Sequence, residues 1–113
     1  MSDTIFAKII NKEIPADIIY EDEQCVAFRD VNPQAPVHFL MVPRKPIASL
    51  QDLIADDEGL IGHMHGVITR LAEQEGIAEG YRVVINSGSS AGQSVFHLHF
   101  HILGGRPMRW PPG

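Results

Sequence analysis

The chain has 113 residues and a formal net charge of −5 at pH 7, and 44% of its residues are hydrophobic and 20% charged. These values are typical of one globular domain with a single core, which we expect to span residues 1–113. The acidic balance argues against nucleic acid as a partner, because such a partner requires a basic surface, but a single nucleotide needs only local hydrogen-bond donors.

The first predicted elements are a short helix and a β-hairpin. The spacing of apolar residues predicts a helix over residues 4–12, with Ser2 or Asp3 as its amino-terminal cap. Two short apolar runs, 18–20 and 25–28, flank an acidic turn, which is typical of two antiparallel strands.

A third strand, a long helix and a fourth strand follow. The third strand covers residues 37–42. Asp56 or Asp57 would cap the long helix, and Gly76, which suits a left-handed conformation, would end it. The inward-facing positions of this helix are Leu60, Ile61, Met64, Val67, Ile68, Leu71 and Ala72. The fourth strand covers residues 81–85.

The fifth predicted strand, residues 96–103, carries three histidines that alternate with apolar residues. Such alternation places successive side chains on opposite faces of a sheet. The core-facing residues would be Leu98, Phe100 and Ile102, and the other face would present His97, His99 and His101. Many strands with few helices indicate an α+β fold: a five-stranded antiparallel sheet with one long and one short helix.

Three imidazoles on one face of a strand suggest a chemical role beyond solubility, because Thr, Lys or Glu would serve solubility equally well. One role is metal binding, and the other is nucleophilic or acid–base catalysis, since imidazole titrates near pH 6.5 (roughly). The Cβ atoms of His97 and His101 would lie about 13 Å apart along a strand. Zn–N bonds are only about 2 Å long, so all three rings would hardly reach one ion. A histidine pair with a distant carboxylate remains open, as does a merely solvated strand.

A polar loop over residues 86–94, rich in Gly and Ser, leads into the histidine segment. Such a loop can turn several backbone N–H groups inward and form an anion-binding concavity. It is not a Walker A loop, because no Gly-Lys-Ser/Thr follows. Its position directly before the histidines favours phosphate chemistry.

The segment His97-Leu-His-Phe-His-Ile-Leu103 resembles the His-φ-His-φ-His-φ-φ motif of the histidine triad superfamily, where φ is an apolar residue. The match is closest to its nucleotide-binding protein branch, the purine nucleoside phosphoramidases. Residues 6–15 resemble that branch's amino-terminal segment, and residues 28–40 its nucleoside-binding region. Residues 92–97 and 104–113 resemble its phosphate loop and its Trp-Pro-Pro-Gly tail.

The resemblance implies a purine nucleoside monophosphate or phosphoramidate as the ligand and a set of catalytic residues. His99 would be the nucleophile and would form a nucleotidyl-histidine intermediate. One of its ring nitrogens should then donate to a fixed acceptor, such as a backbone carbonyl. His97 and His101 would orient the site and donate to phosphate oxygens, His38 would support them, and Ser94 would contact phosphate or the leaving group.

The same resemblance implies the nucleotide-binding residues. Asp30 would bind the ribose hydroxyls, and Phe28 and Ile18 would line the base pocket. Gln93 would contact phosphate or the leaving group, and Asn86 would contact phosphate or support the loop. No metal or cofactor is required, and the amino-terminal cysteine pair that holds structural zinc in some relatives is missing.

Two features suggest a second copy of the chain. Gly59, Gly62 and Gly66 lie broadly on one face of the long helix, where each costs roughly 1 kcal/mol relative to Ala. The lone Trp110 sits in a tail stiffened by prolines. We therefore expect a homodimer, with the two sheets continuing across the interface and each tail reaching the other subunit.

The remaining features concern location and an alternative role. Cys25 is the single cysteine and cannot form an internal disulfide, which fits a reducing compartment. No apolar run reaches membrane length and no signal peptide opens the chain, so we expect a cytoplasmic protein without a membrane partner. The alternative to an enzyme is a non-catalytic, nucleotide-binding regulatory partner of another protein.

Overall fold

The computed structural model describes residues 4–113, so the expected caps Ser2 and Asp3 lie outside the described part of the chain. Residues 4–113 form the helices and strands α1 (Ile5–Ile10), β1 (Ile18–Glu21), β2 (Cys25–Arg29), β3 (Val37–Pro43), α2 (Glu58–Gln74), β4 (Tyr81–Val84) and β5 (Phe100–Gly104). Short 3-10 turns lie at Leu50–Asp52, Ala55–Asp57 and Ser89–Ala91. None of the helices within this part of the chain is long and apolar enough to cross a membrane.

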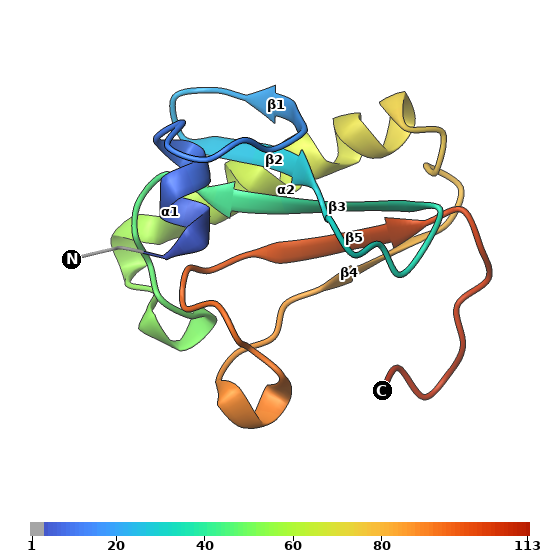
Figure 1. Cartoon of the computed structure of the whole chain (residues 1–113). Coiled ribbons are helices and arrows are strands. Elements are labelled where there is room, and N and C mark those ends of the chain that lie inside the picture. The colour runs from blue at the N-terminus through green and yellow to red at the C-terminus, as the bar shows by residue number, and fades with distance from the viewer. Residues whose placement is uncertain (1–3) are drawn as a thin grey trace.

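The five strands form one antiparallel sheet in the order β1-β2-β3-β5-β4 (Figure 1). β3 lies in the middle and pairs with β2 on one side and β5 on the other. In the β3–β5 register His38 lies opposite Leu103, and Leu40 lies opposite His101. The predicted α+β fold, with a five-stranded antiparallel sheet and one long and one short helix, is confirmed.

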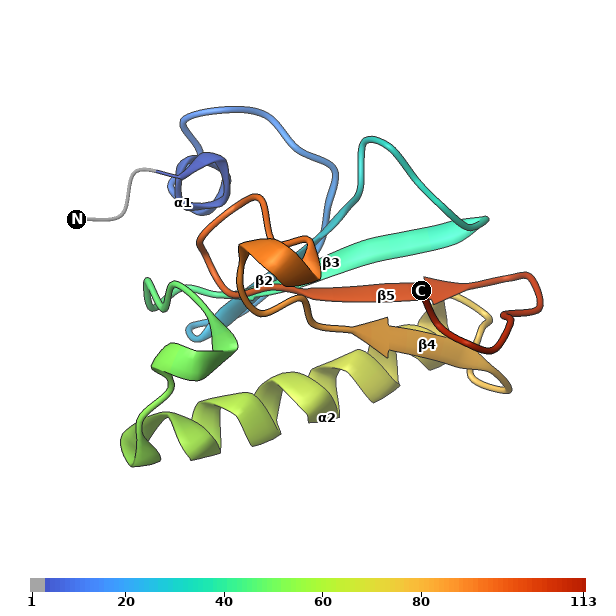
Figure 2. The same cartoon turned by 90° about the horizontal axis from the view of Figure 1, so that it is seen from below.

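The two helices cover opposite faces of the sheet (Figure 2). The larger core lies beneath α2 and contains Phe39, Met41, Met64, Val67, Ile68, Leu71, Leu98, Phe100 and Ile102. The smaller core lies beneath α1 and contains Phe6, Ile9, Ile10, Val26, Phe28, Leu40 and Val42. The prediction that Leu98, Phe100 and Ile102 face the core is confirmed, and the rest of the α1 face is left for the histidines.

Local hydrogen bonds explain where the helices begin and end. The Thr4 hydroxyl accepts from the N–H of Ala7 at 3.1 Å, so Thr4 itself caps α1. Asp57 occupies the cap position of α2 as predicted, but its carboxylate accepts from the N–H of Ile54 and not from the helix. Gly76, with a φ of +77°, follows α2 in the left-handed region, as predicted.

β5 begins at Phe100 and not at residue 96, and this break shapes the histidine segment. β3 ends at Pro43, which has no N–H and so cannot extend the ladder toward the residues before β5. The N–H of Leu98 donates instead to the carbonyl of Ile47, at 2.7 Å. The expectation of a regular strand from residue 96 is therefore wrong, because Leu98 bonds to Ile47, in the irregular chain after Pro43, instead of to β3.

Candidate active site

The histidines meet on the face of the sheet that α1 covers, at the point where β5 begins. The loop between β4 and β5, with its 3-10 turn Ser89–Ala91, lies over the same face (Figure 2). β3 contributes His38 beside His101, and the end of β2 contributes Asp30. One helix, one loop and three strands thus supply side chains to one place.

His99 has a defined proton position. Its Nδ1 lies 2.8 Å from the carbonyl oxygen of His97, and a carbonyl can only accept, so Nδ1 carries the proton. Burial lowers the pKa of His99, which keeps the ring neutral and leaves a lone pair on Nε2. The expected hydrogen bond to a backbone carbonyl is present, and the ring has the tautomer that a nucleophile attacking through Nε2 requires.

Phe6 of α1 packs against the His99 ring, a contact that the sequence did not indicate. The two ring centroids are 4.8 Å apart at an interplanar angle of 80°, and Phe6 also packs edge-on against Phe28 at 5.5 Å. These contacts restrict the His99 ring, since rotation about its side-chain bonds would strike Phe6. The one feature of the sequence that could have indicated this contact is the resemblance of residues 6–15 to the amino-terminal segment of the histidine triad nucleotide-binding branch.

A chain of hydrogen bonds fixes the proton on His101. The backbone N–H of Gln34 donates to Nδ1 of His38 at 3.0 Å, so neutral His38 carries its proton on Nε2. That Nε2 lies 3.0 Å from Nδ1 of His101, which must accept, so neutral His101 carries its proton on Nε2. Burial, with His99 and His38 nearby, lowers the pKa of His101 to about 4. The neutral His101 ring is therefore a donor through Nε2.

Asp30 lies directly beside this histidine pair. Its Oδ2 is 3.4 Å from Nε2 of His38 and 3.9 Å from Nδ1 of His101, and its Oδ1 accepts from the N–H of Asn32 at 2.8 Å. A carboxylate has about four acceptor positions, so further hydrogen bonds to a ligand are available to it.

His97 is placed differently from the expectation that it donates to phosphate. The residue is 1% exposed, and its Nε2 lies 2.7 Å from the carbonyl oxygen of Pro43. Its Nδ1 is buried and makes no hydrogen bond within residues 4–113. The ring borders a cavity of about 160 Å³ next to Ala7 and Ile10 of α1. No ring N–H is left for phosphate, and the backbone carbonyl of His97 accepts from Nδ1 of His99.

Gln93 also differs from the expectation of a phosphate contact. It is 4% exposed, its Oε1 accepts from the N–H of Gly88 at 2.9 Å, and its Nε2 donates to the carbonyls of Ala48 and Val95 at 2.8 and 3.1 Å. Both amide N–H groups and the amide oxygen are thus engaged. Gln93 braces the loop from inside, because its burial turns the amide toward protein groups.

Ser94 and Asn86 remain open to a ligand. Ser94 is exposed at the end of the loop, and Asn86 is half-buried beside Gly92. Gly88 and Gly92 have φ values of +94° and +98°, a region that favours glycine, so they allow the loop to fold tightly over this face.

An apolar cavity of about 190 Å³ lies between α1 and the end of β2. Its lining residues are Ile5, Phe6, Ile9, Ile14, Pro15, Ala16, Phe28, Arg29, Asp30, Val31 and Leu40. Phe28 and Asp30 thus lie together as predicted. Ile18 pairs with Phe28 in the β1–β2 register and packs against the same core, but it borders a neighbouring cavity that shares Ile14, Pro15 and Ala16 with this one.

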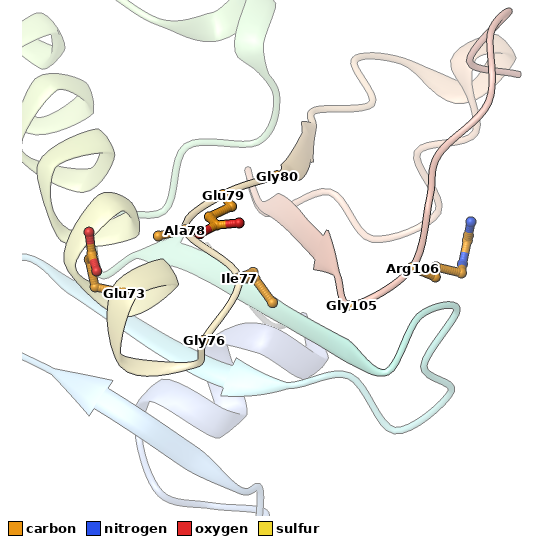
Figure 3. A pocket seen from close by; sticks show the side chains of 8 residues that line it. All are labelled: Glu73, Gly76, Ile77, Ala78, Glu79, Gly80, Gly105 and Arg106. Atoms are coloured by element: carbon orange, nitrogen blue, oxygen red, sulfur yellow. The ribbon is translucent and has the colours of Figure 1, made fainter.

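A larger cavity of about 550 Å³ lies away from the histidines. Its residues come from the end of α2, the turn that leads to β4, and the turn after β5, and they include Gly76, Gly80 and Gly105 (Figure 3). No histidine and no aromatic side chain lines it. Although it is larger than the cavity beneath α1, it therefore lacks the residue types expected of the catalytic site.

Within residues 4–113, two groups of side chains have the residue types of a metal site. The ligand atoms of Asp30, His38 and His101 lie within 4.8 Å of one another. A histidine that binds metal through Nε2 donates its Nδ1 proton to an acceptor, whereas Nδ1 of His38 faces the N–H of Gln34. The N–H of Gln34 leaves the His38 proton on Nε2, the nitrogen that would have to bind the ion, and so disfavours metal binding by Asp30, His38 and His101.

The second group is Asp22, Cys25 and His63. The Asp22 carboxylate accepts from the N–H groups of Gln24 and Cys25, from the Tyr20 hydroxyl and from His63, at 2.7 to 2.8 Å. Burial raises the pKa of the Cys25 thiol to about 12, so the thiolate that a metal requires is disfavoured. The arrangement is better explained as a structural hydrogen bond that joins Asp22 in the β1–β2 turn to His63 of α2 than as a metal site.

Known proteins resemble this chain over nearly its whole length. The sequence profile of the HIT domain matches residues 11–108. An uncharacterised HIT-like protein of Synechococcus elongatus is 59% identical over 111 residues, which cover 98% of this chain and 97% of the relative. Another HIT-like protein, from Synechocystis sp., is 56% identical with the same coverage.

Solved structures agree with the sequence relatives. A HIT family hydrolase from Legionella pneumophila Philadelphia 1 has a TM-score of 0.96 and 47% identity, covering 98% of this chain and 100% of that chain. A histidine triad nucleotide-binding protein from Candida albicans has a TM-score of 0.82 and 30% identity, covering 96% of this chain and 83% of that chain.

The buried histidines predict that stability depends on pH. Burial lowers the pKa values of His38, His97, His99 and His101, so the folded protein binds fewer protons than the unfolded chain just below the ordinary histidine pKa of about 6.5. Stability should therefore be complete above about pH 6.5 and should fall as the pH drops toward about 4, where His101 titrates.

Chemical denaturation at about pH 7.5 and about pH 5 measures this loss of unfolding free energy. The His101→Asn variant, which lacks one of these four rings, should lose less stability over the interval than the wild type. An NMR titration in which the His101 ring of the folded protein gains its proton near pH 6.5 would contradict the prediction.

Proposed function

Because the chain belongs to the HIT domain family, we propose that it is a cytoplasmic purine nucleoside phosphoramidase. It would hydrolyse the P–N bond of adenosine or guanosine 5′-monophosphoramidates. The observation that carries the proposal is the His99 ring, whose Nδ1 is anchored on the His97 carbonyl while Nε2 keeps its lone pair. The similarity to a HIT family hydrolase over the whole fold supports hydrolysis in general.

The proposed reaction has two steps at phosphorus. First, Nε2 of His99 attacks, an N–P bond forms at the ring, and the substrate's P–N bond breaks as the amine leaves with a proton taken from solvent. Water then attacks phosphorus, the ring–phosphorus bond breaks, water returns one proton to solvent, and the nucleoside monophosphate is released. The cycle adds one water across the P–N bond. While the ring carries the nucleotidyl group it is positively charged, and the His97 carbonyl stabilises that charge.

The donors for phosphate in this proposal come from β5 and the loop. Nε2–H of His101 is a neutral donor next to His99, with 5.0 Å between the ring centroids. The Ser94 hydroxyl, Asn86 and backbone N–H groups of the loop supply further donors. Gln93 contributes by holding the loop. With these donors the reaction needs no metal or cofactor.

The nucleoside would occupy the apolar cavity beneath α1. Phe28 and Phe6 offer aromatic surface to a purine, and Asp30 lies between that cavity and the histidine pair. This order matches a nucleotide, in which the ribose lies between base and phosphate. A carboxylate at this position can accept from the ribose hydroxyls.

The surface away from the site supports a homodimer. The positions next to Gly59 and Gly62 on α2 are open, with no atom within 4 Å of an added Cβ, and β4 is an unpaired edge of the sheet. In the tail, Arg82 of β4 donates to the Arg109 carbonyl at 2.9 Å, and Trp110 is 83% exposed. A two-fold partner would extend both sheets through β4 and receive the tail.

The first prediction from this proposal concerns the nucleophile. His99→Asn should lower phosphoramidase turnover on the order of a thousandfold or more and leave binding of a nucleoside monophosphate nearly unchanged, because the variant lacks the attacking nitrogen. Steady-state kinetics and calorimetry measure the two effects. His65→Asn, an exposed histidine on α2, is the matched control and should retain full activity.

Trapping separates an enzyme from a non-catalytic nucleotide-binding protein. Rapid denaturation of a single-turnover reaction should yield protein that carries one nucleotidyl group on His99, detected by peptide mass. Nucleotide binding without any trapped adduct or turnover would favour the non-catalytic role instead.

The second prediction concerns ribose recognition. Asp30→Ala should weaken binding of adenosine 5′-monophosphate by roughly 1 to 3 kcal/mol, the range for hydrogen bonds to a charged group. The loss should shrink for the 2′,3′-dideoxy ligand, which lacks both hydroxyls. Asp56→Ala, an exposed carboxylate at the start of α2, controls for net charge. An equal loss for both ligands would show that Asp30 does not bind ribose.

The third prediction concerns assembly. Sedimentation should give a dimer at micromolar concentration, and a monomer would exclude the proposed interface. Deletion of residues 109–113 should change kcat or the preference among amine leaving groups while leaving the unfolding midpoint nearly unchanged, because an exposed tail adds little to the core. If the truncated protein has unchanged kinetic constants for substrates with several different amine leaving groups, the tail does not take part in the active site.

A further inference from the structure

The proton position on His101 depends on a peptide group outside the histidine segment. Gln34 lies in the connection between β2 and β3, and its backbone N–H occupies Nδ1 of His38. If that N–H moved away, the His38 proton could sit on either nitrogen, and His101 could then carry its own proton on Nδ1. A lone pair would replace the N–H on Nε2 of His101.

Gln34 is itself held on its carbonyl side by Arg106. Nε and Nη2 of Arg106 both donate to the Gln34 carbonyl at 3.1 Å, and Nη1 donates to the Pro107 carbonyl at 3.0 Å. A planar guanidinium that places two donors on one oxygen fixes the orientation of the Gln34–Ala35 peptide better than a single donor does. The N–H that meets His38 belongs to the preceding peptide, so Gln34 is held at both of its peptide groups, by His38 on one side and by a residue beyond β5 on the other.

The turn that carries Arg106 is fitted closely to the same connection. Gly105 has a φ of +92°, and a Cβ added there would lie 2.9 Å from Cβ of Pro36. The turn therefore approaches the β2–β3 connection more closely than a residue with a side chain permits. This contact and the Arg106 hydrogen bonds independently join the same two segments.

We propose that Arg106 is a positioning residue, which holds the Gln34 carbonyl, thereby fixes the backbone of Gln34 and its N–H, and so keeps the proton of His38, and hence that of His101, on Nε2. The effect on turnover rests on the proposed phosphoramidase function, whereas the effect on the tautomers does not. Arg106 touches neither His38 nor His101 and reaches them only through Gln34.

The test combines ring nitrogen NMR with kinetics. In the wild type, nitrogen-15 shifts should show His38 and His101 as single Nε2–H tautomers at neutral pH. Arg106→Met should give mixed tautomers at both rings and lower kcat by roughly tenfold, the factor that corresponds to the loss of one hydrogen bond, with a smaller change in KM. Arg106→Lys keeps the charge and a donor but not the planar guanidinium, so its tautomer populations and kcat should lie between those of the wild type and those of Arg106→Met.

Lys8→Met is the matched control, because it removes a positive charge whose side chain makes no hydrogen bond within residues 4–113; its tautomers and kcat should equal those of the wild type. Wild-type tautomers in folded Arg106→Met would overturn the proposal. If that variant does not fold, wild-type tautomers in Arg106→Lys would overturn it. A wild-type protein with the expected tautomers but no phosphoramidase activity would refute the proposed function and leave the positioning role intact.

Discussion

The carbonyl oxygen of His97 decides which nitrogen of His99 holds the proton, and the rest of the site is arranged around that choice. The carbonyl stands before β5, which begins at Phe100, and Nδ1 of His99 lies 2.8 Å from it. The irregular segment before the strand thus supplies the acceptor for the ring. Phe6 then limits the ring to that position.

The proton positions on His99 and His101 are both set by backbone groups, which do not titrate. His99 is set by a carbonyl, and His101 is set through His38 by the N–H of Gln34. Burial keeps the rings neutral, and the backbone then selects the tautomer. The two rings consequently have opposite characters on Nε2, a lone pair on His99 and an N–H on His101, although they are the same residue type two positions apart.

The sequence predicted what depends on local pattern. Alternation identified the buried residues Leu98, Phe100 and Ile102, and glycine chemistry identified the end of α2 at Gly76. It did not predict the break before β5 or the bracing role of Gln93. Both depend on residues far along the chain, since Pro43 limits the ladder and Ala48 accepts from the Gln93 amide. The contact of Phe6 with His99 is equally nonlocal, since α1 and β5 lie at opposite ends of the chain.

The unpaired Nδ1 of His97 has a consequence for local unfolding of the protein. A buried acceptor without a donor costs about 1 to 3 kcal/mol, and that cost is recovered when water reaches it. Water reaches it if α1 lifts from the sheet, because Ala7 and Ile10 of α1 border the small cavity beside the ring. Hydration of one nitrogen therefore lowers the free energy of detaching α1, and α1 also walls the apolar cavity next to Asp30. The helix whose detachment would hydrate His97 is thus the one that forms a wall of that cavity.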